Sequence, residues 1–384
     1  ANSGDSLTEG DSNVAVGTSA LSTDTKGDRN IAIGSSALGT QNFTTKTDSY
    51  NIGVGHSAGG AVTTGVDNTL MGGLAGDALT DADQNVAIGR SALTSDTLGS
   101  RSVAVGYQTL AFQNFTTAVN SFNTAVGHSA ANKVTTGIQN TIIGANSGNA
   151  LTDADYNTAI GVDALGSDTK GNNSTALGQN ALASQNFTTS TDTKNTAVGY
   201  QSGLFTSTGT GNTFLGNETA RGNSSNKLTG TNNTCLGFQA GYLIQGAAGG
   251  NVLVGNEAGV GVTTGGRNVA VGQLAGRNLS TSLDNVCLGY HAGSYNVGLT
   301  TGNYNTILGA YCHTTAAGST QQIVIGHNVT GNANNSMCFG NAGTDSAIAF
   351  GENSISVPSD ERYKEDIADA TAGLSFIKDL RPVT

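Results

Sequence analysis

Asn13-Val14-Ala15-Val16-Gly17 is the stretch that decides the fold, because close copies of it recur almost to the end of the chain. Each copy is typical of a short strand that ends in a turn at its glycine. We number positions from this closing glycine, so that position −1 is the residue before it. The copies end at Gly17, Gly34, Gly55, Gly72, Gly89, Gly106, Gly127, Gly144, Gly161, Gly178, Gly199, Gly216, Gly237, Gly255, Gly272, Gly289 and Gly309, with weaker copies at Gly326, Gly340 and Gly351.

The gaps between closing glycines are 17, 21, 17 and 17 residues and then start again, which gives a super-repeat of 72 residues. Sequence identity supports this period. The segment Gln41-Asn42-Phe43-Thr44-Thr45 returns at residues 113–117 and 185–189, and residues 79–83 return at 151–155. Tandem duplication explains these identities without a functional site.

The composition excludes an ordinary globular core. The chain has 384 residues with 56 Gly, 2 Pro, no Trp and 11% charged residues. Disordered chains are usually richer in charge and proline, whereas this sequence has a regular pattern of small and aliphatic residues. We therefore predict an all-β fold, a parallel β-roll or β-solenoid of about 20 short stacked repeats that bury a thin continuous core.

Side chains alternate along each predicted strand. Position −1 is a large aliphatic residue and position −3 is Val, Ile or Thr, so these two share one face, while a small residue such as Ala15 occupies the other face. We expect the bulky face to point inward and the small face to pack against other chains. Because one thin roll is marginal alone, a homotrimer is the expected assembly.

Asparagine recurs at position −4, for example at Asn13, Asn30 and Asn68. Its side chain suits the turn that enters the strand, where it bonds local backbone, and it equally suits a ladder of stacked asparagines. Both interpretations are structural.

The four cysteines take positions that alanine holds in other units. Cys235, Cys287 and Cys338 lie at position −2, and Cys312 lies three residues after Gly309. They are predicted to be free thiols in small buried positions rather than disulfides or metal ligands.

Charge and hydropathy exclude several functions. The net charge is −11 and no basic run follows a phosphate backbone, so nucleic acid is not an expected partner. No run of 18 apolar residues is present, so no membrane insertion is expected, and the first residues lack the features of a signal peptide. Every glycine-rich stretch belongs to the repeat, and no carboxylate pair forms a glycosidase-like cleft. We expect no cofactor, no metal and no substrate turnover.

The composition changes abruptly after Gly351. Charge is dense from Ser359 to Asp366, and Ile367, Ala370, Leu374 and Ile377 form an apolar stripe with helical spacing. The chain is thus divided into a repeat shaft (residues 1–342), a junction (343–358) and the start of a helical domain (359–384). By its chemistry alone, Ser359 suits a helix N-cap.

Two resemblances add to this interpretation. The pattern Asn-Val-Ala-Val-Gly-x-x-Ala, over residues 11–342, is similar to the head repeat of trimeric autotransporter adhesins, although the units here are longer. That resemblance implies a left-handed parallel β-roll of three chains wound around one axis.

The second resemblance concerns the C-terminal segment. Ser359-Asp360-Glu361-Arg362-x-Lys364-Glu365-x-Ile367, followed by Leu380-Arg381-Pro382-Val383, resembles the start of the endosialidase-type intramolecular chaperone (peptidase S74-like) of phage tail spikes and fibres. The resemblance implies that Ser359 and Lys364 form a dyad that cuts the chain once, at the serine, after the trimer has folded. Domains of this family are longer than residues 359–384, so the domain is truncated in this sequence.

Together these patterns lead us to expect a trimeric fibre of a bacteriophage tail, in the virion or otherwise extracellular, that attaches to a glycan or protein receptor on the host surface. The alternative is a bacterial surface adhesin of the autotransporter type or another extracellular fibre.

Three further groups are candidate sites. Phe43, Phe115 and Phe187 lie in the longer units and are candidates for receptor contact, or else they cover a wider turn. His56 and His128 suit either a turn or a metal shared across a trimer. Asp81 and Asp83, repeated as Asp153 and Asp155, resemble half a calcium loop that lacks the remaining oxygen ligands.

Overall fold

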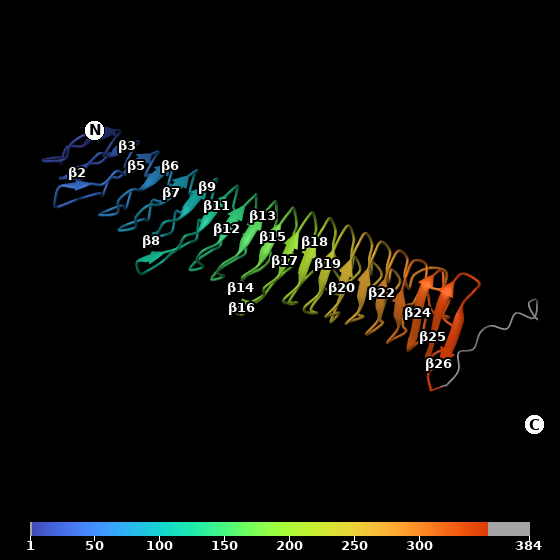
Figure 1. The fold of residues 1–384 in the computed structure, drawn as a ribbon. Coiled ribbons are helices and arrows are strands. Elements are labelled where there is room, and N and C mark those ends of the chain that lie inside the picture. Colours follow the sequence, from blue (N-terminus) through green and yellow to red (C-terminus); the bar gives the residue numbers. More distant parts are fainter. Residues whose placement is uncertain (1, 352–384) are drawn as a thin grey trace, which may run out of the picture.

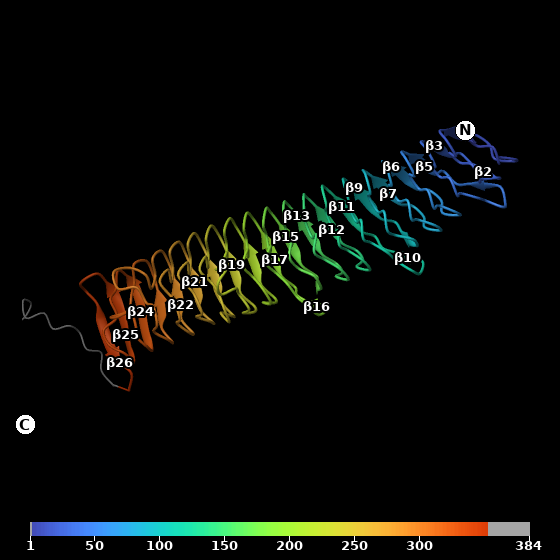
Figure 2. The same ribbon diagram turned by 180° about the vertical axis from the view of Figure 1, so that it is seen from behind.

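The protein is a long, gently bent rod of stacked turns (Figures 1 and 2). The computed structural model describes residues 2–351, and among these residues every regular element is a strand. The rod has about 19 turns, so the predicted all-β, parallel solenoid is confirmed. The helical stripe predicted at residues 367–377 lies outside the described residues.

The strands are short and nearly identical in length. They are β1 (Val14–Val16), β2 (Gly27–Asp28), β3 (Ile31–Ile33), β4 (Thr47–Asp48), β5 (Ile52–Val54), β6 (Thr69–Met71), β7 (Val86–Ile88), β8 (Gly99–Ser100), β9 (Val103–Val105), β10 (Val119–Asn120), β11 (Thr124–Val126), β12 (Thr141–Ile143), β13 (Thr158–Ile160), β14 (Gly171–Asn172), β15 (Thr175–Leu177), β16 (Thr191–Asp192), β17 (Thr196–Val198), β18 (Thr213–Leu215), β19 (Thr234–Leu236), β20 (Val252–Val254), β21 (Val269–Val271), β22 (Val286–Leu288), β23 (Thr306–Leu308), β24 (Gln322–His327), β25 (Ser336–Asn341) and β26 (Ser346–Ala349).

One 20-stranded sheet runs the length of the rod. Each turn adds one strand parallel to the last, with equal positions paired, as in Ala15 with Ala32. The final strand, β26, pairs antiparallel with β25. The extra residues of the three longest early units form small two-stranded sheets, β2–β4, β8–β10 and β14–β16, beside the main sheet. The longer units therefore leave the register of the main sheet unchanged.

The closing glycine is required by the close approach of successive turns. Gly17 has a φ of 132°, and a Cβ there would lie 2.5 Å from the carbonyl oxygen of Gly34 in the next turn. Any side chain would therefore clash with backbone and strain the turn. This geometry explains why the position is glycine in unit after unit.

The predicted orientation of the strands is wrong. The small residue at position −2, such as Ala32 or Ala87, is fully buried, whereas Val16 and Leu215 at position −1 are 57% and 45% exposed. The interior is too narrow for two large side chains per strand. It holds the residue at position −2 together with residues of the following turn, such as Leu38.

Volume in this core is matched between neighbouring turns. Where Leu70 replaces alanine at position −2, the adjacent turn residues are Gly59 and Gly76. A Cβ on Gly59 or Gly76 would lie 2.6 Å or 2.8 Å from a methyl group of Leu70. A large residue therefore fits only where glycine makes room for it, as expected of a close-packed interior.

The asparagines at position −4 form the ladder that the sequence allowed. The backbone N–H of Asn68 donates to Oδ1 of Asn51 at 2.9 Å, and that of Asn85 donates to Oδ1 of Asn68 at 3.0 Å. The Nδ2 of Asn68 donates to the carbonyl of Ala82 at 2.8 Å. Each buried side chain thus links its own turn to the next and fixes the register of the strands.

The prediction of free, buried cysteines is confirmed. All four thiols are unbridged and buried. Burial raises the pKa of Cys287 to about 12 from an ordinary 9.0 and also raises that of Cys235. These thiols act as small core side chains in place of alanine.

Candidate interaction face

The outward side of the main sheet is a continuous strip of apolar side chains, which we call the apolar face. It consists of positions −3 and −1 of the strands from β1 to β25. Position −1 supplies a large side chain in every turn, and each of these is partly or largely exposed: Val16, Ile33, Val54, Met71, Ile88, Val105, Val126, Ile143, Ile160, Leu177, Val198, Leu215, Leu236, Val254, Val271, Leu288, Leu308, Ile325 and Phe339.

Position −3 completes the face with β-branched residues in all but the last of these strands. In seven consecutive turns, from Thr124 to Thr234, this residue is threonine, and in most other turns it is valine or isoleucine. Such residues suit a flat pleated surface. With strands 4.7–4.9 Å apart, about 19 turns make this face about 90 Å long.

Aromatic residues line both rims of the apolar face. Tyr50, Phe122, Tyr156 and Tyr304 at position −5 are 47–60% exposed, and tyrosine or phenylalanine also recurs at position +1. Arginines cover some of these rings, as Arg29 does at 5.5 Å from the ring centre of Tyr50. The rims thereby extend the apolar strip sideways.

Large exposed apolar side chains are confined to this side of the rod. Among residues 2–351, all those with high exposure lie on the apolar face or its rims, apart from Phe112, Leu243, Val297 and Phe350. Large contiguous apolar patches are rare on soluble monomers and mark interaction sites. Parallel sheets, moreover, are normally covered on both faces.

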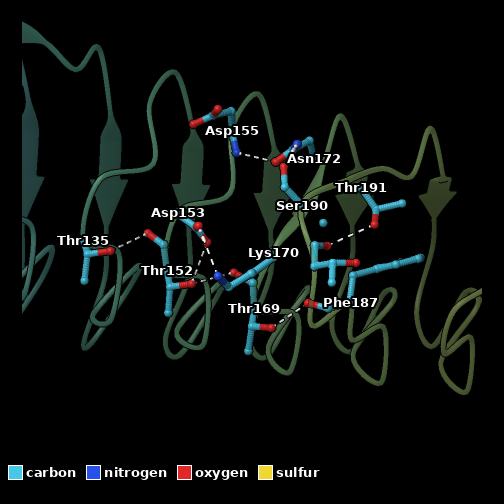
Figure 3. A network of polar contacts seen from close by, with 12 residues as sticks. Thr135, Thr152, Asp153, Asp155, Thr169, Lys170, Asn172, Phe187, Ser190 and Thr191 are labelled. Atoms are coloured by element: carbon cyan, nitrogen blue, oxygen red, sulfur yellow. Dashed lines mark hydrogen bonds and ion pairs between the residues drawn. The ribbon is translucent and has the colours of Figure 1, made fainter.

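The polar turns satisfy their hydrogen bonds within the rod. Figure 3 shows a threonine ladder in which Oγ1 of Thr135 donates to the carbonyl of Thr152 at 3.2 Å, and Oγ1 of Thr152 donates to that of Thr169 at 3.0 Å. Thr169 in turn donates to the carbonyl of Phe187 at 2.6 Å. This side of the molecule holds its turns together.

The aspartates considered for calcium take part in the same contacts between turns. Lys170 lies 3.2 Å from Asp153, and Asp155 accepts the backbone N–H of Ile138 at 2.8 Å. Burial works against ionisation of Asp153, but hydrogen bonds from Thr152 and Lys170 hold its pKa below the ordinary value. Among the described residues, no three His, Cys, Asp or Glu side chains gather where a metal would bind.

The three phenylalanines proposed for receptor contact are buried. Phe43, Phe115 and Phe187 expose only 6–7% of their surface. They therefore cover the inside of the longer turns and do not project from the rod, so the expectation of receptor contact is corrected. The alternative in which they cover a wider turn agrees with this burial.

Behind these phenylalanines lies a feature that the sequence analysis missed. The fully buried carboxylate of Asp24 accepts hydrogen bonds from the backbone N–H of Gly27 and Phe43, both at 3.1 Å, and from Nε2 of Gln41 at 2.6 Å. Oε1 of Gln41 accepts from Asn51, which belongs to the asparagine ladder.

The same arrangement recurs around Asp96 and Asp168. The recurrence of an aspartate 17 residues before each of these glutamines was the available signal. These carboxylates shape the long turns and are not accessible for chemistry.

The remaining sequence candidates are not brought together. His56 and His128 are both exposed, and His128 stacks on Tyr107 with ring centres 5.2 Å apart. Ser359 and Lys364 lie outside the described residues. Within residues 2–351, no helix is long and apolar enough to cross a membrane.

Comparison with known proteins adds no relative. No family model matches the chain, and neither a curated protein nor a solved structure is significantly similar to it.

Proposed function

We propose that this chain is the shaft of a homotrimeric fibre, in which the apolar faces of three copies pack against one another around a common axis. The single observation that carries the proposal is the unbroken ladder of large aliphatic side chains at position −1 along the outside of the sheet. Burial of such a side chain contributes about 1.5–3 kcal/mol. Because the ladder has one member in each turn, the contribution accumulates along the whole rod.

Three copies suit this geometry because each chain offers one flat strip rather than two. A strip on one side of a rod is covered completely when identical strips meet around an axis, and closed symmetry prevents further growth. The antiparallel strand β26 also ends the parallel stack at one end. Capping of this kind limits unregulated pairing at the sheet edge.

The proposed biological role is attachment of a bacteriophage tail fibre or spike to its host. The rod supplies rigid reach, and the segment with Ser359 and Lys364 is proposed to be the start of a chaperone that assists trimer folding and cuts itself off once. Intact mass of a longer chain, with and without Ser359→Ala, tests this part. Loss of a fragment that begins near Ser359 only in the unsubstituted chain supports it, and an uncut chain in both contradicts it.

Paired substitutions test the trimer. Leu215→Asp with Leu236→Asp places two charges on the apolar face in adjacent turns, and we expect light scattering to give the mass of one chain, 38.4 kDa. The control Phe112→Asp removes a side chain that is 57% exposed but lies off this face, and should leave three chains associated. If the double variant keeps the mass of the unsubstituted protein, the apolar face is not the interface.

A further inference from the structure

Six aromatic rings gather on three successive turns near the C-terminal end of the rod. Tyr311 is at the centre. Its ring centre lies 5.2 Å from Tyr290, 4.7 Å from Tyr295 and 5.8 Å from His291. His327 contacts Tyr311 at 5.9 Å, and His313 contacts Tyr295 at 6.0 Å. Among the described residues, no other ring-to-ring contacts join more than two rings.

The cluster depends on a departure from the repeat. The unit ending at Gly309 has 20 residues, three more than its predecessor. The excess forms a small loop, closed where the backbone N–H of Leu299 donates to the carbonyl of Gly293 at 3.0 Å. Tyr295 lies in this loop and packs against Tyr311 of the following turn. The rod therefore breaks its own period at the point where it builds the cluster.

The geometry of the rings decides what kind of ligand they suit. Tyr290 and Tyr311 are almost perpendicular, at 88°, and their centres are only 5.2 Å apart. Rings in such direct contact leave no space between them, so they do not form a cage around a cation. Tyr290 is 40% exposed and Tyr295 and Tyr311 are partly exposed, so a ligand would lie on top of the cluster.

The chemistry of the surface is uncharged and amphipathic. Phenol rings offer apolar faces, while their hydroxyls and the imidazole nitrogens supply hydrogen bonds. Burial and the neighbouring tyrosines raise the pKa of Tyr311, so its phenol stays neutral at ordinary pH. A pyranose ring has matching properties, because it presents a face of C–H bonds and a rim of hydroxyls. The net charge of −11 disfavours a nucleotide, which also stacks but carries phosphate.

We propose that Tyr290, Tyr295 and Tyr311, with the adjoining histidines, form a platform that binds an uncharged pyranose of a cell-surface glycan. This inference rests on the proposed attachment function and assigns the contact to one end of the rod. Because the rings hold one another in place, little side-chain freedom is lost when the sugar binds.

Saturation-transfer NMR on the full chain tests the platform. The probes are the methyl glycosides of glucose, galactose and N-acetylglucosamine. We expect transfer to at least one of them, strongest at protons of its C–H face, and at least a tenfold loss in Tyr295→Ala. Tyr295 lies in a loop outside the sheet, so this change leaves the strands intact. Phe112→Ala, which removes an equally accessible ring elsewhere, should bind as the unsubstituted chain does.

The platform is wrong if none of the three glycosides receives transfer, or if Tyr295→Ala binds as well as the unsubstituted chain. Adsorption of the fibre to host cells, measured in parallel, separates this failure from failure of the proposed function. A fibre that adsorbs equally with and without Tyr295→Ala still attaches, but by another surface, whereas a fibre that does not adsorb at all contradicts attachment itself.

Discussion

Asn30 accepts the backbone N–H of Asn51 through Oδ1 at 3.0 Å, yet its own Nδ2, although buried, has no hydrogen-bond partner. Asn68 occupies the same position of a later turn and uses both of its side-chain polar atoms. Serine stands at the positions equivalent to Asn30 in the next two super-repeats, Ser102 and Ser174. The ladder is therefore weakest at the start of each long turn.

This difference predicts unequal effects of one substitution. Asn68→Ser removes paired buried groups and should lower the free energy of unfolding by about 2–3 kcal/mol. Asn30→Ser removes an unsatisfied donor along with one bond, and should cost less by about 1–2 kcal/mol. Denaturation followed by circular dichroism measures both variants. Equal losses would show that the unpaired amide of Asn30 does not matter.

The buried carboxylates of the long turns should be essential to those turns. In Asp96→Asn, an amide NH2 must face at least one of the donors Gly99 N, Phe115 N and Gln113 Nε2. The cost is about 2–3 kcal/mol, because hydrogen bonds to a charged acceptor are stronger than neutral ones. We expect faster hydrogen exchange around residues 112–122 while distant turns are unaffected. Unchanged exchange there would contradict the role given to Asp96.

The thiols should be inert in the folded rod. At pH 8 the pKa of about 12 keeps Cys287 protonated as well as buried, so a maleimide should label it only after unfolding. The sign for stability follows. Because the folded pKa lies above the ordinary 9.0, burial of this thiol favours folding below pH 9, and the contribution is lost as pH rises from 9 towards 12. Mass spectrometry after native labelling checks the first point, and native labelling of Cys287 would refute it.

Removal of one whole super-repeat should shorten the rod without unfolding it. Deletion of residues 90–161 joins Gly89 to Val162 and preserves every position of the repeat. The rod loses four turns, so small-angle scattering should report a maximum dimension about 19 Å shorter. Deletion of residues 90–149 is the mismatched control and should give an insoluble chain. A folded product from both deletions would contradict the dependence on register.

Much of this fold was predictable because the repeat is local. The spacing of the glycines, the asparagine ladder and the alanine-like positions of Cys235 and Cys287 all follow from the sequence. The orientation of the strands did not follow, because a period of two residues separates two faces without saying which is inside. What decides it is the narrow interior, visible only when Leu70 is seen to require Gly59 and Gly76.

The site was less predictable than the fold. Phe43 was expected at the surface because it lies in a longer turn, but Asp24, 19 residues earlier, accepts its backbone N–H and the ring is buried. The aromatic cluster was missed since Tyr290, Tyr295 and Tyr311 meet across successive turns of unequal length. Contacts between turns depend on the stacking of the rod, which a single unit does not reveal.

The central claim is that the apolar faces of three chains meet, and a spin label on that face tests it most directly. Val198→Cys places a single reactive thiol on the face, since the native cysteines are buried. Labels at residue 198 of neighbouring chains should lie close enough for strong dipolar broadening, while labels at Phe112→Cys should not. Sharp, uncoupled spectra at residue 198, together with the mass of one 38.4 kDa chain in solution, would contradict the trimer.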